Sequence, residues 1–294
     1  MKVTEFPPDA ARCRAIWPLI VLIGSFGLHS PAFTSVSAQT ALPAAKTAAK
    51  PVAKVSSSKF NVAAALNLAL RQPMLVERST KAFLMISLKA LVYRSQNQLN
   101  DSLAEFEKVL KELQKTAPTA EIRENYQLLD QLFDEYKAIK SKPVNSSNAA
   151  ELAEQNEELV WIAQKGAMLL QAHGKSVRND LIATAGDART LTQRIAKLYL
   201  FRASGIRSTV IAGDLKKAEG EYRAAIDRLL RATQNTEQIK SELALAESQW
   251  FFLKHAMERL NANQTSTVEL EHVSKACDNI LEVMERVVKL YEGV

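Results

Sequence analysis

The stretch AGDARTLTQRIAKLYLF, residues 185–201, has the composition and spacing of a helix with two apolar faces. One face runs through Leu191, Ile195 and Leu198 and continues towards Ala188 and Thr184. The second face lies roughly opposite and consists of Ile182, Ala185, Ala196 and Leu200. Arg189 and Gln193 lie in the middle of this second face. One face is enough to cover a bundle core, so the second predicts a further helical partner.

The stretch has a second copy earlier in the chain. ALRQPMLVERSTKAFLM, residues 69–85, aligns with residues 185–201 without a gap. In this register the matching pairs are Leu75 with Leu191, Arg78 with Arg194, Lys81 with Lys197 and Phe106 with Tyr222. After a shift of one residue, Phe133 falls on Trp250. The common register predicts an internal repeat rather than a coincidence of helical spacing.

Composition and breaks predict an all-α fold of two tandem up-down four-helix bundles. The 294 residues include only nine glycines and nine prolines and are rich in strong helix formers. The predicted modules span residues 60–174 and 175–294. The expected helical segments are 60–95, 100–117, 119–141 and 148–173, followed by 176–208, 213–233, 235–261 and 266–292. Asn100-Asp101 and Gly213-Asp214 are the expected breaks after the first helix of each copy. Short connections between such helices favour antiparallel neighbours.

The N-terminal segment predicts export. Basic residues precede the apolar run 16–26, and Val36-Ser37-Ala38 offers the small residues that a signal peptidase reads. Residues 1–38 are therefore expected to be a cleaved signal peptide, with an uncleaved N-terminal anchor as the alternative. Residues 39–59, rich in Ala, Lys, Pro and Ser, are expected to form a disordered linker. The mature protein would then be periplasmic or secreted, without a membrane span.

Residues for catalysis or cofactor binding do not form recognisable groups. Cys277 is the only cysteine after the signal segment, so an intramolecular disulfide and a CxxCH haem site are both excluded. Glu269 and His272 have the ExxH spacing of di-iron bundles, but the second such pair is missing, and a helix start is the preferred interpretation. We expect no enzyme activity, no cofactor and no metal. The absence of a basic helix with interleaved aromatic residues argues against nucleic acid as a partner.

The motif in residues 185–197 resembles a known family. It is similar to the first-helix motif, approximately A-G-R-Q-R-M-L-[ST]-Q-R-[MI]-A-K, of the type IV pilus methyl-accepting chemotaxis transducer N-terminal domain (PilJ-like). That family is similar to the sensor domain of nitrate/nitrite-responsive histidine kinases. The second copy departs from the motif at Asp187, Ala188 and Thr190. The first copy keeps fewer positions, namely Ala69, Arg71, Gln72, Met74, Leu75, Arg78 and Lys81.

The resemblance implies two tandem sensor-like modules that bind a small anion such as nitrate or nitrite. In that family the bundles pair through this helix, and an arginine ahead of the motif's methionine binds the anion. The implied ligand residues are Arg189, Gln193 and Arg194. The basic motif positions of the first copy are Arg71, Arg78 and Lys81, whereas Pro73 stands at the position that matches Arg189. No output domain is recognised in the chain, so such a sensor would signal through a membrane partner.

Two hypotheses therefore stand side by side: an exported anion sensor, and a structural helical-bundle protein that binds no ligand. The pairing face of Ile182, Ala185, Ala196 and Leu200 would meet either the matching helix of the first copy or the same helix of another chain. For internal pairing, Glu77 is the expected built-in acceptor for Arg189, which would make the contact structural. For pairing between chains, two facing Arg189 side chains would hold a planar anion.

Overall fold

Eight helices and no strand are formed by the residues that the computed structural model describes, which are 61–142, 146–205, 209–258 and 266–293. The helices are α1 (Val62–Ser87), α2 (Val92–Thr116), α3 (Ala120–Lys140), α4 (Ser146–His173), α5 (Val177–Ala203), α6 (Thr209–Leu230), α7 (Glu237–Glu258) and α8 (Thr267–Glu292). The all-α prediction is confirmed. The predicted signal peptide and linker, residues 1–59, lie outside the described residues.

Side-chain caps fix the starts of several of these helices, among them α1, α5 and α8. Asn61 and Ser176 accept hydrogen bonds from backbone N–H groups in the first turns of α1 and α5. Ser266 and Glu269 form a reciprocal capping box at the start of α8. Glu269 therefore belongs to a helix start, as the sequence interpretation of the ExxH spacing expected.

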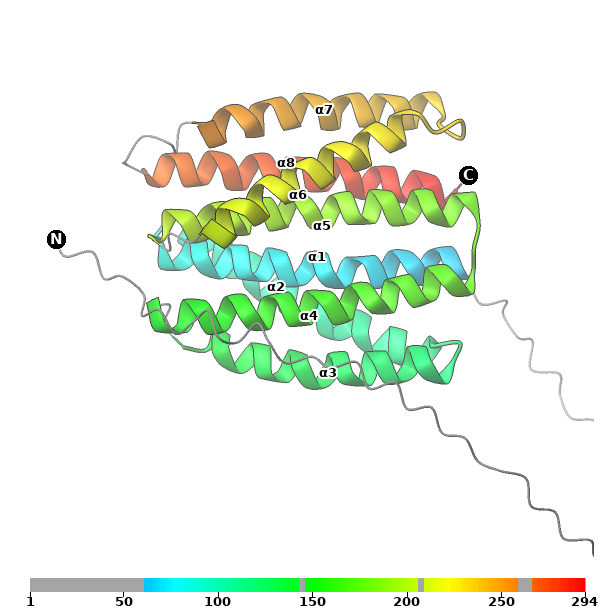
Figure 1. Cartoon of the computed structure of the whole chain (residues 1–294), viewed down its shortest axis with the longest axis horizontal. Coiled ribbons are helices and arrows are strands. Elements are labelled where there is room, and N and C mark those ends of the chain that lie inside the picture. The colour runs from blue at the N-terminus through cyan, green and yellow to red at the C-terminus, as the bar shows by residue number, and fades with distance from the viewer. Residues whose placement is uncertain (1–60, 143–145, 206–208, 259–265, 294) are drawn as a thin grey trace, which may run out of the picture. The chain divides into compact units, whose positions relative to one another are not determined.

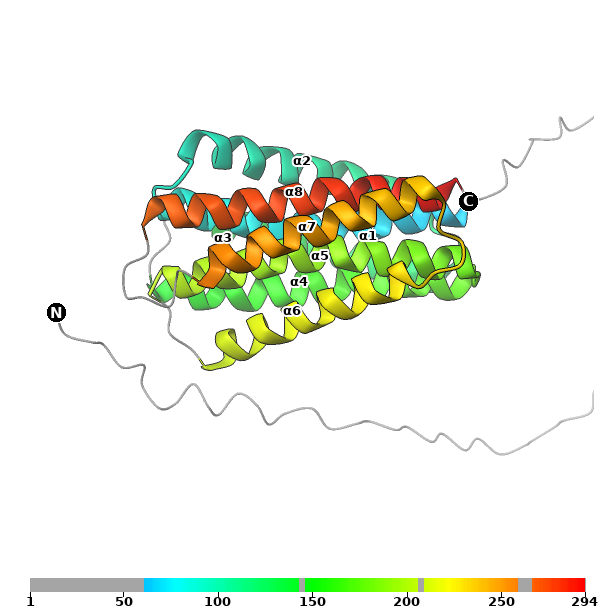
Figure 2. The same cartoon turned by 90° about the horizontal axis from the view of Figure 1, so that it is seen from above.

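Helices α1 and α5 lie side by side in the centre of the molecule and run in the same direction (Figure 1). α1 also packs on α2 and α4, while α5 packs on α6 and α8. α3 rests mainly on α4, and α7 rests mainly on α8. α2 and α6 occupy opposite sides of the central pair (Figure 2). The repeated helix of the sequence is thus the central element of each copy.

The two copies place matching residues in matching contacts. Phe106 of α2 stacks on Phe133 of α3 with ring centroids 4.2 Å apart. Tyr222 of α6 stacks on Trp250 of α7 with centroids 4.6 Å apart and a similar interplanar angle, 26° against 28°. These are the positions that the sequence repeat pairs, so its register extends from the first helix of each copy into the next two.

Two predicted breaks were wrong. Asn100-Asp101 lies inside α2 and Gly213-Asp214 inside α6, and their solvent-facing positions explain why polar or small residues are tolerated there. The chain leaves α1 earlier, with Lys89 and Leu91 at φ angles of 57° and 45°. Glycine usually adopts such angles, and no glycine marks this turn in the sequence. After α5, Gly205 takes a φ of 84° and does follow that preference.

None of the described helices has an apolar stretch long enough to cross a membrane.

Candidate functional site

α5 packs on α1 of the same chain, and the predicted pairing face of α5 is buried. Its residues Ile182, Ala185, Ala196 and Leu200 are each at most 1% exposed. A Cβ atom built on Gly186 would lie 2.9 Å from the Cβ of Leu70, its own counterpart in the first copy. Since contacts that close do not occur between real Cβ atoms, the missing side chain of Gly186 is what lets the two helices approach.

Arg189 is fully buried at this helix pair and already has an acidic partner. Its side chain is 0% exposed, and Nη1 lies 2.8 Å from a carboxylate oxygen of Glu285 on α8. Nη2 donates a longer bond, 3.4 Å, to the backbone carbonyl of Asn67 on α1. Burial lowers the pKa of Arg189, and the nearby Glu285 carboxylate opposes that effect. The guanidinium is therefore held by groups of its own chain.

The expected partnership of Arg189 with Glu77 was wrong. Gly186 of α5 packs on its own counterpart, Leu70 of α1, and in this register Glu77 is the counterpart of Gln193 rather than of Arg189. Glu77 consequently meets the neighbouring Arg194, with Oε1 3.0 Å from Nη1. Arg189 lies about one turn away and faces α8 instead.

Glu77, Arg194 and Lys197 form a buried ion cluster with Glu157 of α4. Lys197 Nζ lies 2.8 Å from both Glu77 and Glu157, and Arg194 Nη2 lies 2.7 Å from Glu157. Glu77 is 0% exposed and Lys197 is 1% exposed, whereas Arg194 is 20% and Glu157 46% exposed, so the cluster extends from the interior to the surface. Burial alone would raise the pKa of Glu157, but Lys197 and Arg194 outweigh it and the pKa is lowered. Arg194 and Lys197 share the two carboxylates, so the charges of the cluster balance.

A chain of polar side chains continues from Lys197 into the first copy. Lys197 donates to Asn156, and Asn156 donates to Thr80. Thr80 in turn contacts the hydroxyl of Tyr136, which also donates to the backbone carbonyl of Val76. These groups are buried yet satisfied, which makes them a rigid structural network rather than an open binding site.

The counterparts in the first copy have different partners. Arg71 lies 2.6 Å from Glu105 of α2 and 3.4 Å from Glu285, so it shares the latter with Arg189. Arg78 donates to Ser102 of α2 at 2.8 Å and lies 3.4 Å from Glu105. All of these side chains sit between α1, α2 and α8.

Lys81 crosses into the second copy. It is 0% exposed and pairs with Asp278 of α8, which also accepts from Arg94 and Gln98 of α2. Lys197 makes the reciprocal crossing to Glu157 of α4, so each lysine reaches an acid on the last helix of the other copy.

Gln193 is buried and its amide donates to the backbone carbonyl of Cys277 at 3.3 Å. Burial raises the pKa of the Cys277 thiol to about 12, so the thiol stays protonated and unreactive at neutral pH. The structure therefore brings Arg189, Arg194 and Gln193 to the same helix pair, each bonded to a different group of the chain.

The acids that hold these cations were not identified from the sequence. Asp278 and Glu285 are seven residues apart on α8, which places them on one side of the helix beside its buried apolar stripe. Acids at this spacing next to a core stripe are a usable signal for partners of buried cations. Glu157 of α4 offers no such pattern.

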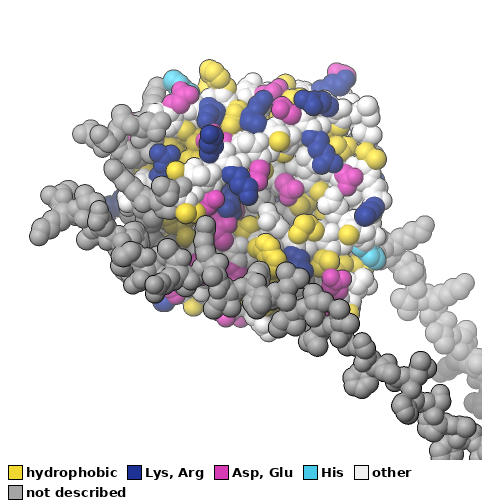
Figure 3. All heavy atoms as spheres, in the orientation of Figure 1, with side chains coloured by type: hydrophobic (Ala, Val, Ile, Leu, Met, Phe, Trp, Pro, Cys, Tyr) yellow, Lys and Arg dark blue, Asp and Glu magenta, His cyan; other side chains and the backbone are white. Residues whose placement is uncertain are grey.

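Other kinds of site are not indicated by the part of the chain that the structure describes. No three His, Cys, Asp or Glu side chains there come together as a metal site. On the face shown in Figure 3, basic, acidic and hydrophobic side chains are intermixed. Comparison with protein-family models, with curated proteins and with solved structures finds no significant match.

Proposed function

We propose that the chain is an exported, non-enzymatic helical module that acts by binding a partner protein. In this proposal each sequence copy is one four-helix module, and the two modules pair through α1 and α5 within one chain. The resemblance of residues 185–197 to the PilJ-like motif supports a sensor-like module, and the composition of residues 1–38 supports export. Of the two hypotheses, we propose the structural module without a ligand and not the anion sensor.

The observation that carries this choice is the ion pair between Arg189 and Glu285. A free anion at Arg189 would have to displace a carboxylate that is tethered 2.8 Å from the guanidinium. A tethered group has a high effective concentration, so it competes strongly against a dilute free ligand. The match of Pro73 with Arg189 also removes the second arginine that a symmetrical anion clamp would need.

One observation favours anion sensing as a second candidate. Arg71, Arg78 and Arg189 share only two carboxylates, Glu105 and Glu285. The buried Nε atoms of Arg71 and Arg189 have no hydrogen-bond partner among the described residues. Glu292 also acts on the charge of Arg189, so it is the unused donors of this region that suit a small anion.

A thermal-shift experiment separates the two candidates. The purified chain is melted with nitrate, nitrite or chloride, in parallel with the variants Arg189→Ala and Glu285→Gln. The structural proposal predicts no specific nitrate or nitrite effect on the parent and a lower melting temperature for Arg189→Ala without any ligand. It also predicts that Glu285→Gln, which frees Arg189, gains an anion response.

The opposite result would be a parent protein stabilised by nitrate or nitrite. A ligand at 100 times its Kd should add about 2.7 kcal/mol to the stability. If Arg189→Ala abolishes that gain while the surface variant Arg286→Ala keeps it, anion sensing replaces the structural proposal. Arg286 suits the control because it is 47% exposed and pairs with Glu242 away from the helix pair.

A further inference from the structure

The two sides of the central helix pair differ at matching positions. On the side of α2 and α8, the guanidinium of Arg71 lies between the carboxylates of Glu105 and Glu285. The sequence repeat matches Arg71 with Asp187 and Glu105 with Glu221. On the side of α4 and α6, an aspartate therefore stands where the bridging arginine would be.

Glu285, the second carboxylate beside Arg71, also has a counterpart on the other side. Lys81 pairs with Asp278 and Lys197 pairs with Glu157, and these contacts place α8 and α4 in equivalent positions. In that register, seven residues further along, Gln164 of α4 stands where Glu285 stands on α8. The open side thus has three acceptor-bearing side chains, Asp187, Glu221 and Gln164, and no arginine at the position that matches Arg71.

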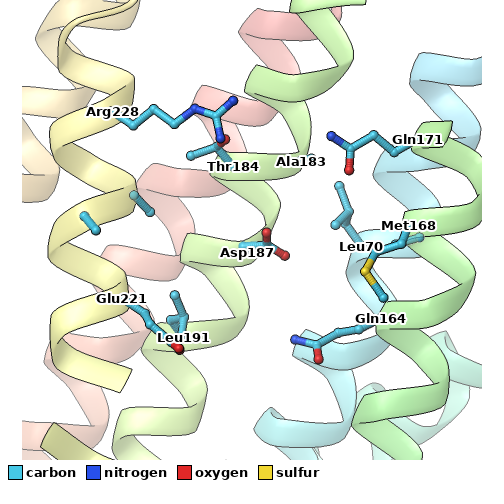
Figure 4. A pocket seen from close by; sticks show the side chains of 13 residues that line it. Leu70, Gln164, Met168, Gln171, Ala183, Thr184, Asp187, Leu191, Glu221 and Arg228 are labelled. Atoms are coloured by element: carbon cyan, nitrogen blue, oxygen red, sulfur yellow. The ribbon is translucent and has the colours of Figure 1, made fainter. Parts of the chain in front are cut away.

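These three side chains line a groove between α4 and α6 with a volume of about 500 Å³ (Figure 4). Leu191 of α5, Met168 of α4 and Leu70 of α1 give the groove an apolar wall. A second hollow of similar size continues past Gln164, Leu191 and Glu221 towards Trp161. The acceptors are thus accessible from outside and lie next to apolar surface.

The acids of the groove lack a strong internal partner. Within the described part of the chain, Asp187 forms no ion pair. Glu221 has Lys217 at 3.8 Å, but that lysine is 73% exposed and holds the carboxylate weakly. Arg228 lines the groove beside Thr184, and Gln171 faces it from α4 (Figure 4).

The raised pKa of Asp187 indicates that its carboxylate lacks a cationic partner. Asp187 is open to the groove, but the helices around it remove part of its hydration and raise its pKa to about 6; Glu221 also raises the pKa, whereas Arg189 and Arg228 oppose the rise. A cation placed between Asp187 and Glu221 would favour the ionised carboxylate and remove this penalty.

We propose that the groove between α4 and α6 binds an organic cation, a guanidinium or primary amine on an aliphatic stem, between Asp187, Glu221 and Gln164. The cation takes the place that Arg71 fills on the opposite side, and the stem lies along Leu191 and Met168. The same chemistry is carried by a free small molecule and by an arginine side chain of a partner protein. The site is separate from the Arg189–Glu285 pair, so it does not depend on the function proposed above.

Calorimetric titration of the purified chain with butylguanidinium tests the proposal, with neutral butylurea as the matched control. We expect butylguanidinium to bind and butylurea not to bind. Asp187→Asn and Glu221→Gln should each weaken binding at least about tenfold, the loss of one charge-assisted contact. Glu105→Gln, the matching change on the closed side, should leave the Kd unchanged.

The variant Asp187→Arg gives an independent test. It restores on the open side the arginine that Arg71 provides on the closed side, so it should abolish binding of butylguanidinium and raise the melting temperature. Circular dichroism establishes whether each variant is folded before its binding is compared. Binding by the parent should also strengthen as the pH rises through about 6, because Asp187 must be ionised.

The source of the cation is distinguished by a blocked tripeptide with arginine at its centre. Tighter binding of the tripeptide than of butylguanidinium indicates a partner's arginine, and the reverse order indicates a free small molecule. The proposal is overturned if neither probe binds, if butylurea binds equally well, or if binding is insensitive to both Asp187→Asn and Glu221→Gln in folded protein.

Discussion

The central helices α1 and α5 carry the same motif but have different environments along one line of side chains. On α1 the line is Arg71, Leu75 and Arg78; Leu75 is only 1% exposed, and both arginines contact side chains of α2. On α5 the matching line begins with Asp187 and continues through Leu191, which is only partly buried. One sequence pattern thus produces a closed side and an open side.

The difference shows how a repeated helix is specialised by few substitutions. A long arginine at position 71 bridges two acids on neighbouring helices, whereas the short side chain of Asp187 forms no ion pair within the described residues. Glu77 and its counterpart Gln193 differ in the same way, since only the former balances two buried cations. The core positions keep the helices together, and the flanking charges decide what each side binds.

The largest expected effect is at Glu77, whose removal breaks the internal ion cluster. Glu77→Gln keeps the size of the side chain but leaves Arg194 and Lys197 with Glu157 alone. Removing one partner of a buried ion pair costs about 3–5 kcal/mol, and we expect the lower end because Arg194 is 20% exposed. Urea denaturation measures this change, and Glu105→Gln, at a partly exposed pair, should cost less than half as much. Equal losses of stability in the two variants would show that the Glu77 cluster contributes no more than a partly exposed ion pair.

Shortening Leu75 and Leu191 to alanine should reduce the free energy of unfolding by different amounts. Leu75→Ala removes a buried side chain and should destabilise the fold by about 3 kcal/mol, within the usual range for a buried leucine. Leu191→Ala removes a side chain that faces the groove and should cost about 1 kcal/mol. Equal losses in urea denaturation would mean that the groove is closed in solution.

Part of this arrangement was predictable from the sequence because it depends on local spacing. The two apolar faces of residues 185–201 and the helix repeat depend on periodicity, which each copy displays on its own. The same periodicity does not show which acid meets Arg189, because Glu285 is 96 residues away and arrives only through packing of α8. Glu77 was the nearer match in the repeat and proved to serve Arg194 instead.

The asymmetry between the two sides was visible in the sequence as isolated departures from the motif. Asp187 was noted as a departure, but its meaning depends on Glu221 and Gln164 facing it from two other helices. The early end of α1 was hidden for another reason. Lys89 and Leu91 take up left-handed angles that their residue types do not favour, so tertiary packing rather than local preference sets that turn.

Close approach of the compared helices should depend on Gly186. Gly186→Ala places a methyl group 2.7 Å from the nearest Leu70 side-chain atom, and such overpacking costs about 1–3 kcal/mol. Gly220→Ala on α6 is the control, since nothing lies within 4 Å of the added atom. That variant should stabilise its helix by roughly 0.5–1 kcal/mol, so thermal melts of the two should move in opposite directions.

The smallest expected effect is a pH dependence that only the open side shows. The pKa of Asp187 is raised from an ordinary 3.8 to about 6, so the folded chain holds this proton more tightly than the unfolded chain does. Stability should therefore fall as the pH rises from about 4 to about 6 and stay constant above that window. Because one side of Asp187 faces solvent, we expect a loss of about 1 kcal/mol or less.

The variant Asp187→Asn separates the contribution of Asp187 to the pH dependence of stability from the contributions of the other ionisable groups. The variant should be more stable than the parent at pH 7 and lose that advantage at pH 4, as measured by urea denaturation at both values. The control is Glu105→Gln on the closed side, where the carboxylate is already paired with Arg71; this variant should show no such gain at pH 7. If the difference in the free energy of unfolding between Asp187→Asn and the parent stays constant from pH 4 to pH 7, ionising the aspartate in the groove has no extra cost. The open and closed sides would then differ in shape alone, and not in the charge that the groove presents.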